Sequence, residues 1–192
     1  MFALLGLSRP QQDVLTAFEK CRMVTASDLA DRKAPTFAAY RAPVPKVFEY
    51  AKLDLKSNPT ARMYRTLLRQ EISQGPNFAG YYRVAIWGCG SSCAMFAVVN
   101  LKTGRVITPK GFSATSTPLY FDAETQKVFP DSQSEGGLFG FRKDSRLLVV
   151  LGDLDEDESR EGAFYFVLEN ERLRLIHSTL VEKDCENLRE KR

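Results

Sequence analysis

The feature that most constrains the fold is a change of hydrophobic period after Gly75. From there to residue 181, short runs alternate apolar and polar residues, and turn-forming residues separate the runs. Alternation over about four to eight residues is typical of a strand that buries one face. The runs cover residues 81–87, 94–101, 105–108, 118–129, 140–152 and 162–181. Short strands that follow one another through tight turns predict an antiparallel sheet.

Three of these runs contain a turn of their own. The letters DAETQ lie inside the run over 118–129, and the letters ENE lie inside the run over 162–181. We interpret both runs as hairpins. The run over 140–152 begins with a turn and continues as one strand, and residues 131–137 form a loop before it.

The chain ahead of Gly75 carries helix signals. Residues 10–21 show apolar positions at helical spacing and predict a short helix. Residues 34–50 are interrupted by prolines and predict an extended connector or edge strand. Residues 57–75 predict a second helix, in which Ser57 or Asn58 is the cap and a proline occupies the first turn.

These elements predict one domain of the α+β class over residues 1–192. We expect one antiparallel β-rich sheet or half-barrel with two or three helices at its N-terminal side. Residues 1–50 supply a helix and the proline-rich segment, 51–75 a helix, 76–181 the sheet and 182–192 a tail. With 44% hydrophobic residues, the chain is long enough to bury a core of useful size.

Charge and motifs exclude several function classes. The formal net charge is +3 and no basic block alternates with aromatics, so we expect no nucleic-acid partner. No apolar run approaches the roughly 20 residues of a membrane helix. The opening letters MFALLGLS lack the basic region and cleavage site of a signal peptide. The chain is therefore cytosolic, or mature after removal of a leader, or read from a mis-assigned start. Phosphate-binding and dinucleotide motifs are absent, and we expect no cofactor.

The chain has four cysteines, Cys21, Cys89, Cys93 and Cys185. An even number indicates metal binding or catalysis in the cytosol and two disulfides in an exported protein. The termini of a domain often lie close together, so a Cys21–Cys185 bridge is expected. Such a bridge leaves Cys89 to pair with Cys93.

The cysteine pair in the middle of the chain allows several kinds of chemistry. Three residues separate Cys89 from Cys93, one more than in thiol oxidoreductases, and strands flank both. A zinc site would need Cys21 and Cys185 as well, at a spacing that matches no zinc module. Either Cys89 or Cys93 could act as a nucleophile with His177, the sole histidine. A structural disulfide is the interpretation that we favour.

A disulfide here would close a loop that is rich in small residues. Glycine and serine allow a tight bend, and a rigid tip loses little entropy on binding a partner. Trp87 is either an anchor for that partner or a core residue beneath the loop. The candidate binding loop is Trp87, Gly88, Cys89, Gly90, Ser91, Ser92 and Cys93.

Two charged clusters lie outside this loop. One predicted helix face carries Arg62, Arg65 and Arg69, which form either an anion surface or a solvated face. The letters GDLDEDES, residues 152–159, resemble a calcium loop but lack its glycine and its terminal glutamate. We expect this acidic segment to be a solvated hairpin tip. Its carboxylates are Asp153, Asp155, Glu156, Asp157 and Glu158.

The block from QGPNFAGYY through WGCGSSC to KTGRV resembles a family of small, uncharacterised exported bacterial proteins. The resemblance covers roughly residues 53–176 and implies a periplasmic or secreted protein with disulfides, but no activity. Tyr81 stands where that family is expected to have a histidine. A looser architectural analogy is with periplasmic inhibitors of vertebrate-type lysozymes, which present a disulfide loop between two strands.

Together these observations predict a cell-envelope protein that is not an enzyme. Its disulfide-closed loop would bind a protein, either a wall hydrolase that it inhibits or a toxin that it neutralises. The alternatives are an enzyme with a nucleophilic Cys89 or Cys93 and His177, and a metal-binding module of all four cysteines.

Overall fold

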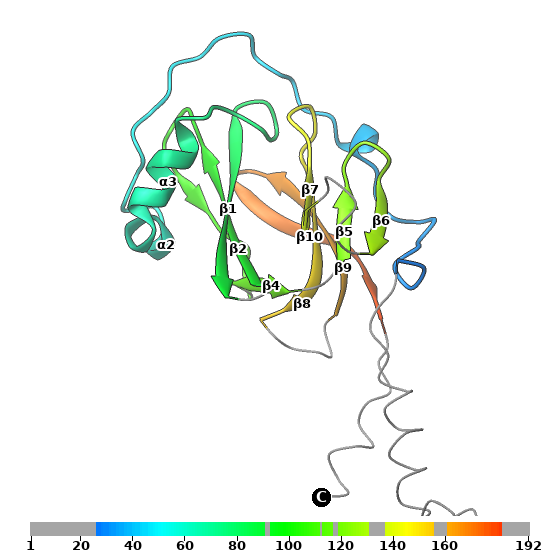
Figure 1. The fold of residues 1–192 in the computed structure, drawn as a ribbon. Coiled ribbons are helices and arrows are strands. Elements are labelled where there is room, and N and C mark those ends of the chain that lie inside the picture. Colours follow the sequence, from blue (N-terminus) through cyan, green and yellow to red (C-terminus); the bar gives the residue numbers. More distant parts are fainter. Residues whose placement is uncertain are drawn as a thin grey trace, which may run out of the picture.

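The computed structural model describes residues 26–90, 93–111, 113–116, 119–130, 137–155 and 161–181. Over these residues the chain forms one eight-stranded sheet, a separate two-stranded sheet and short helices that precede both. Every strand pairing is antiparallel, and the two α-helices that precede the first strand in the sequence lie beside that strand (Figure 1). The α+β prediction is confirmed. The helix expected over 10–21 and the tail over 182–192 lie outside the described residues.

The segment before the helices is largely extended, as its prolines indicate. It contains one element that was not predicted, the 3-10 helix η1 (Phe37–Tyr40). The ring of Phe37 is buried and packs edge-on against Phe121 at 6.2 Å. Arg41 forms an isolated bridge with Ser145, which attaches the segment to the sheet.

The helix predicted over 57–75 is in fact two helices, α2 (Pro59–Met63) and α3 (Arg65–Ile72). The side chain of Asn58 caps α2 by accepting the backbone N–H of Thr60 at 2.9 Å. The break falls at Tyr64, whose φ of −102° and ψ of 25° are not helical. Tyr64 leaves the helical conformation where its ring packs against the sheet below.

The large sheet has the order β1-β2-β4-β8-β9-β10, with β3 beside β2 and β7 beside β8. A hairpin of β5 and β6 forms the small sheet. The strands are β1 (Tyr82–Gly90), β2 (Cys93–Asn100), β3 (Val106–Ile107), β4 (Ala114–Ser116), β5 (Leu119–Asp122), β6 (Lys127–Pro130), β7 (Phe139–Phe141), β8 (Leu147–Leu154), β9 (Glu161–Glu169) and β10 (Arg172–Leu180). The very short β3 and β4 follow one another along the same side of β2.

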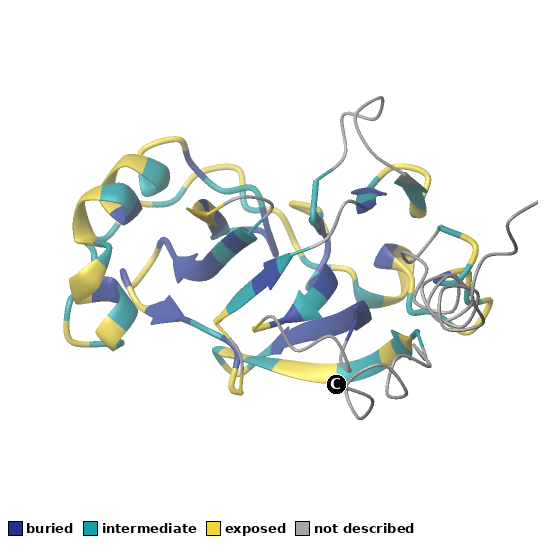
Figure 2. Ribbon diagram, turned by 60° about the horizontal axis from the view of Figure 1, so that its bottom comes forward, coloured by how far each residue is buried: buried dark blue, intermediate teal, exposed yellow. Residues whose placement is uncertain are grey.

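The sheet curls, which brings distant strands together. Val84 of β1 shares one buried apolar cluster with Phe164 and Phe166 of β9, although β2, β4 and β8 lie between them in the sheet. The prediction of an antiparallel β-rich sheet is confirmed, and this shared cluster shows that the sheet is strongly curved. Figure 2 shows the central strands in the buried colour and the helices with exposed outer faces. Burial of both faces explains why β8 and β9 read as nearly continuous apolar runs.

Two further clusters cover the outer face of the sheet. Beneath α2 and α3, Ala61 and Leu68 pack on Ala85, Ala97 and Val99 of the β1–β2 hairpin. Beneath the β5–β6 hairpin and η1, another cluster joins residues of β8 and β9. No helix in the described part of the chain is long and apolar enough to cross a membrane.

Candidate binding site at the β1–β2 hairpin

The β1–β2 ladder continues to the cysteines themselves. Its register runs from Tyr82 opposite Asn100 to Gly88 opposite Ala94, and then from Gly90 to Cys93 across a bulge. Strand pairing therefore extends further into the predicted Gly88–Cys93 loop than expected, as far as Gly90 and Cys93. Cys89 is the extra residue of the bulge, and bulges bend a strand locally. Ser91 and Ser92, which follow the ladder, lie outside the described residues.

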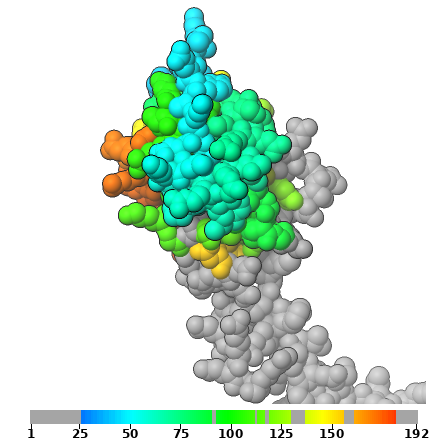
Figure 3. All heavy atoms as spheres, turned by 90° about the vertical axis from the view of Figure 1, so that its left-hand side faces the viewer, coloured from blue at the N-terminus to red at the C-terminus, as the bar shows by residue number. Residues whose placement is uncertain are grey.

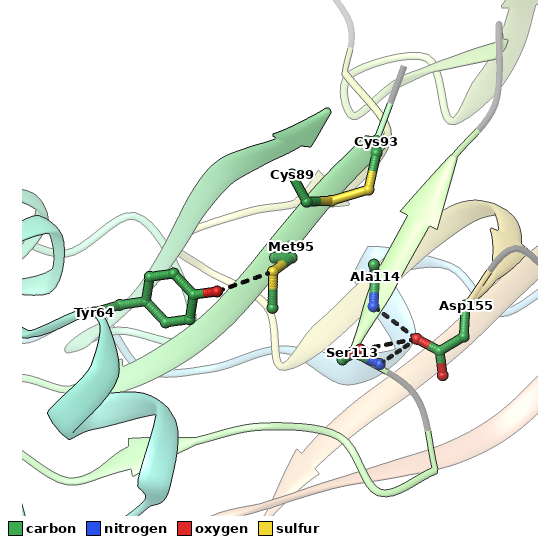
Figure 4. The surroundings of a disulfide bond; sticks show 7 residues. All are labelled: Tyr64, Cys89, Cys93, Met95, Ser113, Ala114 and Asp155. Atoms are coloured by element: carbon green, nitrogen blue, oxygen red, sulfur yellow. Dashed lines mark hydrogen bonds between the residues drawn. A yellow bond between two sulfur atoms is a disulfide. The ribbon is translucent and has the colours of Figure 1, made fainter. Parts of the chain in front are cut away.

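A disulfide joins Cys89 to Cys93 across the end of this hairpin, with a Cα–Cα distance of 5.2 Å. The predicted pairing of these two cysteines is confirmed (Figure 4). Gly88, Cys89 and Gly90 are exposed, and Cys93 is half-buried. We call Gly88, Cys89, Gly90 and Cys93 the hairpin tip. The predicted Cys21–Cys185 bridge lies outside the described residues.

Trp87 lies directly beneath the hairpin tip and not on its surface. Its side chain is 8% exposed, and its ring lies 4.6 Å from the ring of Tyr64. The hydroxyl of Tyr64 donates to the sulfur of Met95, the cross-strand partner of Trp87, at 3.5 Å (Figure 4). Of the two predicted roles for Trp87, the structure shows a core residue and not a surface anchor. The helices α2 and α3 cover the face of the hairpin on which Trp87 lies. Burial removes it from the candidate contact surface.

The acidic segment after β8 makes specific contacts beside the hairpin tip. Cys93 pairs with Ser116 of β4, so β4 forms the next strand of the sheet. The carboxylate of Asp155 accepts hydrogen bonds from the backbone N–H of Ser113 at 2.7 Å and of Ala114 at 3.0 Å (Figure 4). Asp155 is therefore not simply solvated, as the sequence had suggested, because it anchors the start of β4. Residues 156–160 of this segment lie outside the described residues.

His177 lies on β10, and the strands β4, β8 and β9 separate it in the sheet from Cys93 on β2. Its Nε2 atom lies 2.7 Å from the Oδ2 atom of Asp31, which also accepts the hydroxyl of Thr179 at 3.1 Å. The backbone N–H of Lys33 donates to Oδ1 of Asp31 at 2.7 Å. The hydrogen bond from Lys33, followed by that from His177, holds the pKa of Asp31 below its usual value.

The structure therefore does not bring the proposed nucleophile and base together. The sulfurs of Cys89 and Cys93 are bonded to each other, and a thiolate is needed for attack. His177 is engaged by Asp31 at the far edge of the sheet. For a metal, the described residues contain no group of three or more His, Cys, Asp or Glu side chains placed to hold an ion. Within the described chain, the geometry favours a structural role for the cysteine pair.

Comparison of the chain with protein-family models, with curated proteins and with solved structures gave no match.

The residues that support the hairpin tip were only partly recognisable from the sequence. Met95 lies two positions after Cys93, so the strand period places both on one face. Tyr64 lies at helical spacing from Leu67, Leu68 and Ile72, but this spacing does not reveal which strand the helix covers. The contact of Asp155 with β4 had no sequence signal, because β4 is three residues long.

Proposed function

We propose that the protein is a non-enzymatic protein of the cell envelope that inhibits a wall hydrolase by inserting the hairpin tip into the cleft of that enzyme. The observation that carries the proposal is the exposed Cys89–Cys93 disulfide at the end of a long hairpin. A covalently closed hairpin end with exposed residues suits a concave partner surface better than a flat one.

Rigidity supports this role. A disulfide that closes so short a loop restricts the unfolded chain by about 2 kcal/mol in the chain-entropy model. The hairpin tip also rests on the Tyr64–Trp87 contact and lies beside β4, which Asp155 anchors. A preorganised tip loses little conformational entropy on binding, so more of the contact energy appears as affinity.

The disulfide also supports the proposed compartment. Disulfides persist in oxidising environments such as the bacterial periplasm and are rare in the cytosol. An envelope location agrees with the resemblance of the Trp87–Cys93 block to exported bacterial proteins. The substrate site of an enzyme is a concave cleft, which the closed end of a hairpin can enter.

Gly88→Arg tests the proposal with little disturbance to the fold. Gly88 is exposed, and among the described atoms an added Cβ would meet only the carbonyl oxygen of Cys93, at 3.9 Å. The assay follows the turbidity of a peptidoglycan suspension digested by a vertebrate-type lysozyme, an amidase or an endopeptidase. The wild-type protein is expected to slow at least one of these enzymes, and Gly88→Arg is expected to abolish that effect.

Val47→Arg is the matched control. Val47 is 89% exposed on the segment before α2, so the same charge is added away from the hairpin tip. This variant should inhibit as the wild type does. The proposal fails if the wild type slows none of the enzymes, or if Gly88→Arg inhibits as well as Val47→Arg.

A further inference from the structure

A second candidate site lies away from the hairpin tip. A groove of about 960 Å³ runs between the β9–β10 hairpin and residues 105–110, which include β3. Its apolar lining comes from Val106, Ile107, Phe166, Leu173 and Leu175. Leu175 is 48% exposed, which is unusual for a leucine at the centre of a strand. Apolar side chains are thus available to a ligand along this groove.

The charged residues that line the groove are mainly basic. The groove also contains two glutamates, and each forms an ion pair with one of its basic residues. Arg105 lies 3.6 Å from Glu171, and Arg174 lies 2.9 Å from Glu169. Lys110 and Arg172 remain, and neither forms an ion pair with a described carboxylate. The groove therefore carries a net positive charge.

The basic surface continues onto α2. Asn58 lines both the groove and a neighbouring depression of about 500 Å³ on the outer side of α2. That depression carries Lys56, Arg62 and Arg65, none of which forms an ion pair with a described carboxylate. Figure 3 shows α2 in teal and the start of β10 in orange on the same side of the molecule. The two hollows thus form one surface with five uncompensated cations.

We propose that this surface binds an extended acidic segment of a protein. The five cations of the surface provide charge complementarity to carboxylates. The exposed Leu175 and the partly buried Leu173 provide contacts for apolar side chains that alternate with the carboxylates. These cations are Lys56, Arg62, Arg65, Lys110 and Arg172.

An extended polypeptide fits the groove better than other anions do. A membrane surface is broad and would not enter a concave groove. Polyphosphate and similar polymers have no apolar groups to cover Leu173 and Leu175. In addition, β10 is the last strand of the described sheet and pairs with β9 alone. Within the described chain its outer edge has no strand partner, and such an edge accepts an added strand through main-chain hydrogen bonds.

The binding test uses a short fluorescein-labelled peptide of alternating Glu and Leu, followed by fluorescence anisotropy with the full chain. Saturable binding that weakens as NaCl is added is expected. The double variant Lys110→Glu/Arg172→Glu should raise the dissociation constant by about tenfold or more. The matched control, Arg69→Glu/Lys143→Glu, reverses two exposed cations that line neither hollow, and it should bind as the wild type does.

Two further measurements separate a peptide site from a general anion surface. Leu175→Ser should weaken the Glu-Leu peptide several-fold and leave any binding of polyphosphate unchanged. A peptide with Lys in place of Glu should not bind. The inference is overturned if the Glu-Leu peptide does not bind, if both double variants bind alike, or if polyphosphate or phosphatidylglycerol vesicles displace the peptide at equal charge. Gly88→Arg should bind the peptide normally, so this site and the hairpin tip are tested independently.

Discussion

The ring of Tyr64 lies 4.6 Å from the ring of Trp87, at the residue where α2 ends and α3 begins. The same ring contact thus lies at the break between the two helices and covers the only tryptophan. Through Met95, the same contact extends to the strand that carries Cys93. The outer helices therefore support the hairpin tip from below.

Trp87→Ala should destabilise the protein strongly. The side chain is 8% exposed, and its removal leaves a cavity beneath α2 and α3 that costs about 3–5 kcal/mol of unfolding free energy. Ile86→Ala is the control, because the neighbouring Ile86 is 38% exposed and should lose about 1 kcal/mol. Urea denaturation measures both. Equal losses for the two variants would contradict the position of Trp87 in the core.

Replacing both Cys89 and Cys93 by serine should reduce stability without unfolding the sheet. The loop that the bond closes is short, so the expected loss is about 2 kcal/mol. Strands β1 and β2 also pair along their length away from the cysteines, and this pairing does not need the disulfide. The far-ultraviolet circular dichroism spectrum should therefore be unchanged. A variant as stable as the wild type would show that the bond contributes nothing to the folded hairpin.

The carboxylate of Asp31 should make stability depend on pH. The pKa of Asp31 is lower in the folded state, chiefly through the N–H of Lys33 and then through His177. Such a carboxylate adds stability above its unfolded pKa of about 3.9, and that stability disappears as the pH falls through the folded pKa. Asp31→Asn should therefore melt below the wild type at neutral pH, and the gap should close as the pH falls through the folded pKa of Asp31. A gap in melting temperature that stays constant across this range would contradict the assignment.

Two glycines with positive φ allow the stability cost of backbone strain to be measured apart from the cost of a steric clash. Gly104 has a φ of 74°, and a Cβ added there would collide with the carbonyl oxygen of Lys52. Gly111 has a φ of 88° and no described atom within 4 Å of the added Cβ. Gly111→Ala should cost about 1 kcal/mol, and Gly104→Ala should cost about 2 kcal/mol more. Thermal denaturation of the two variants should rank them in that order, and equal values would show that residue 52 moves freely aside.

Much of the sheet could be predicted because strand and turn signals are local. The period of two locates β1, β2 and β8, and the hairpin around residues 169–171 is confirmed. Its central residues, Asn170 and Glu171, have φ values of 48° and 55°, which suit a tight two-residue turn. Strands β4 and β7 were not predicted, because three residues are too few to show a period.

The candidate site was harder to predict than the sheet. The break at Tyr64 arises from tertiary packing, so helix signals along the chain could not reveal it. Alternation could not decide whether Trp87 is exposed, because it does not reveal that α2 and α3 cover that face of β1. The pairing of Asp31 with His177 joins residues 146 positions apart and depends entirely on the fold.

The most direct test of the account is a non-reducing peptide map by mass spectrometry of the protein from its native host. No lysine or arginine lies between Cys89 and Cys93, so trypsin leaves both cysteines in one peptide. The account predicts that this peptide carries an internal disulfide and lacks the two thiol hydrogens, because the hairpin tip of an exported protein stays closed. Free thiols at both positions in the freshly isolated protein would contradict the account.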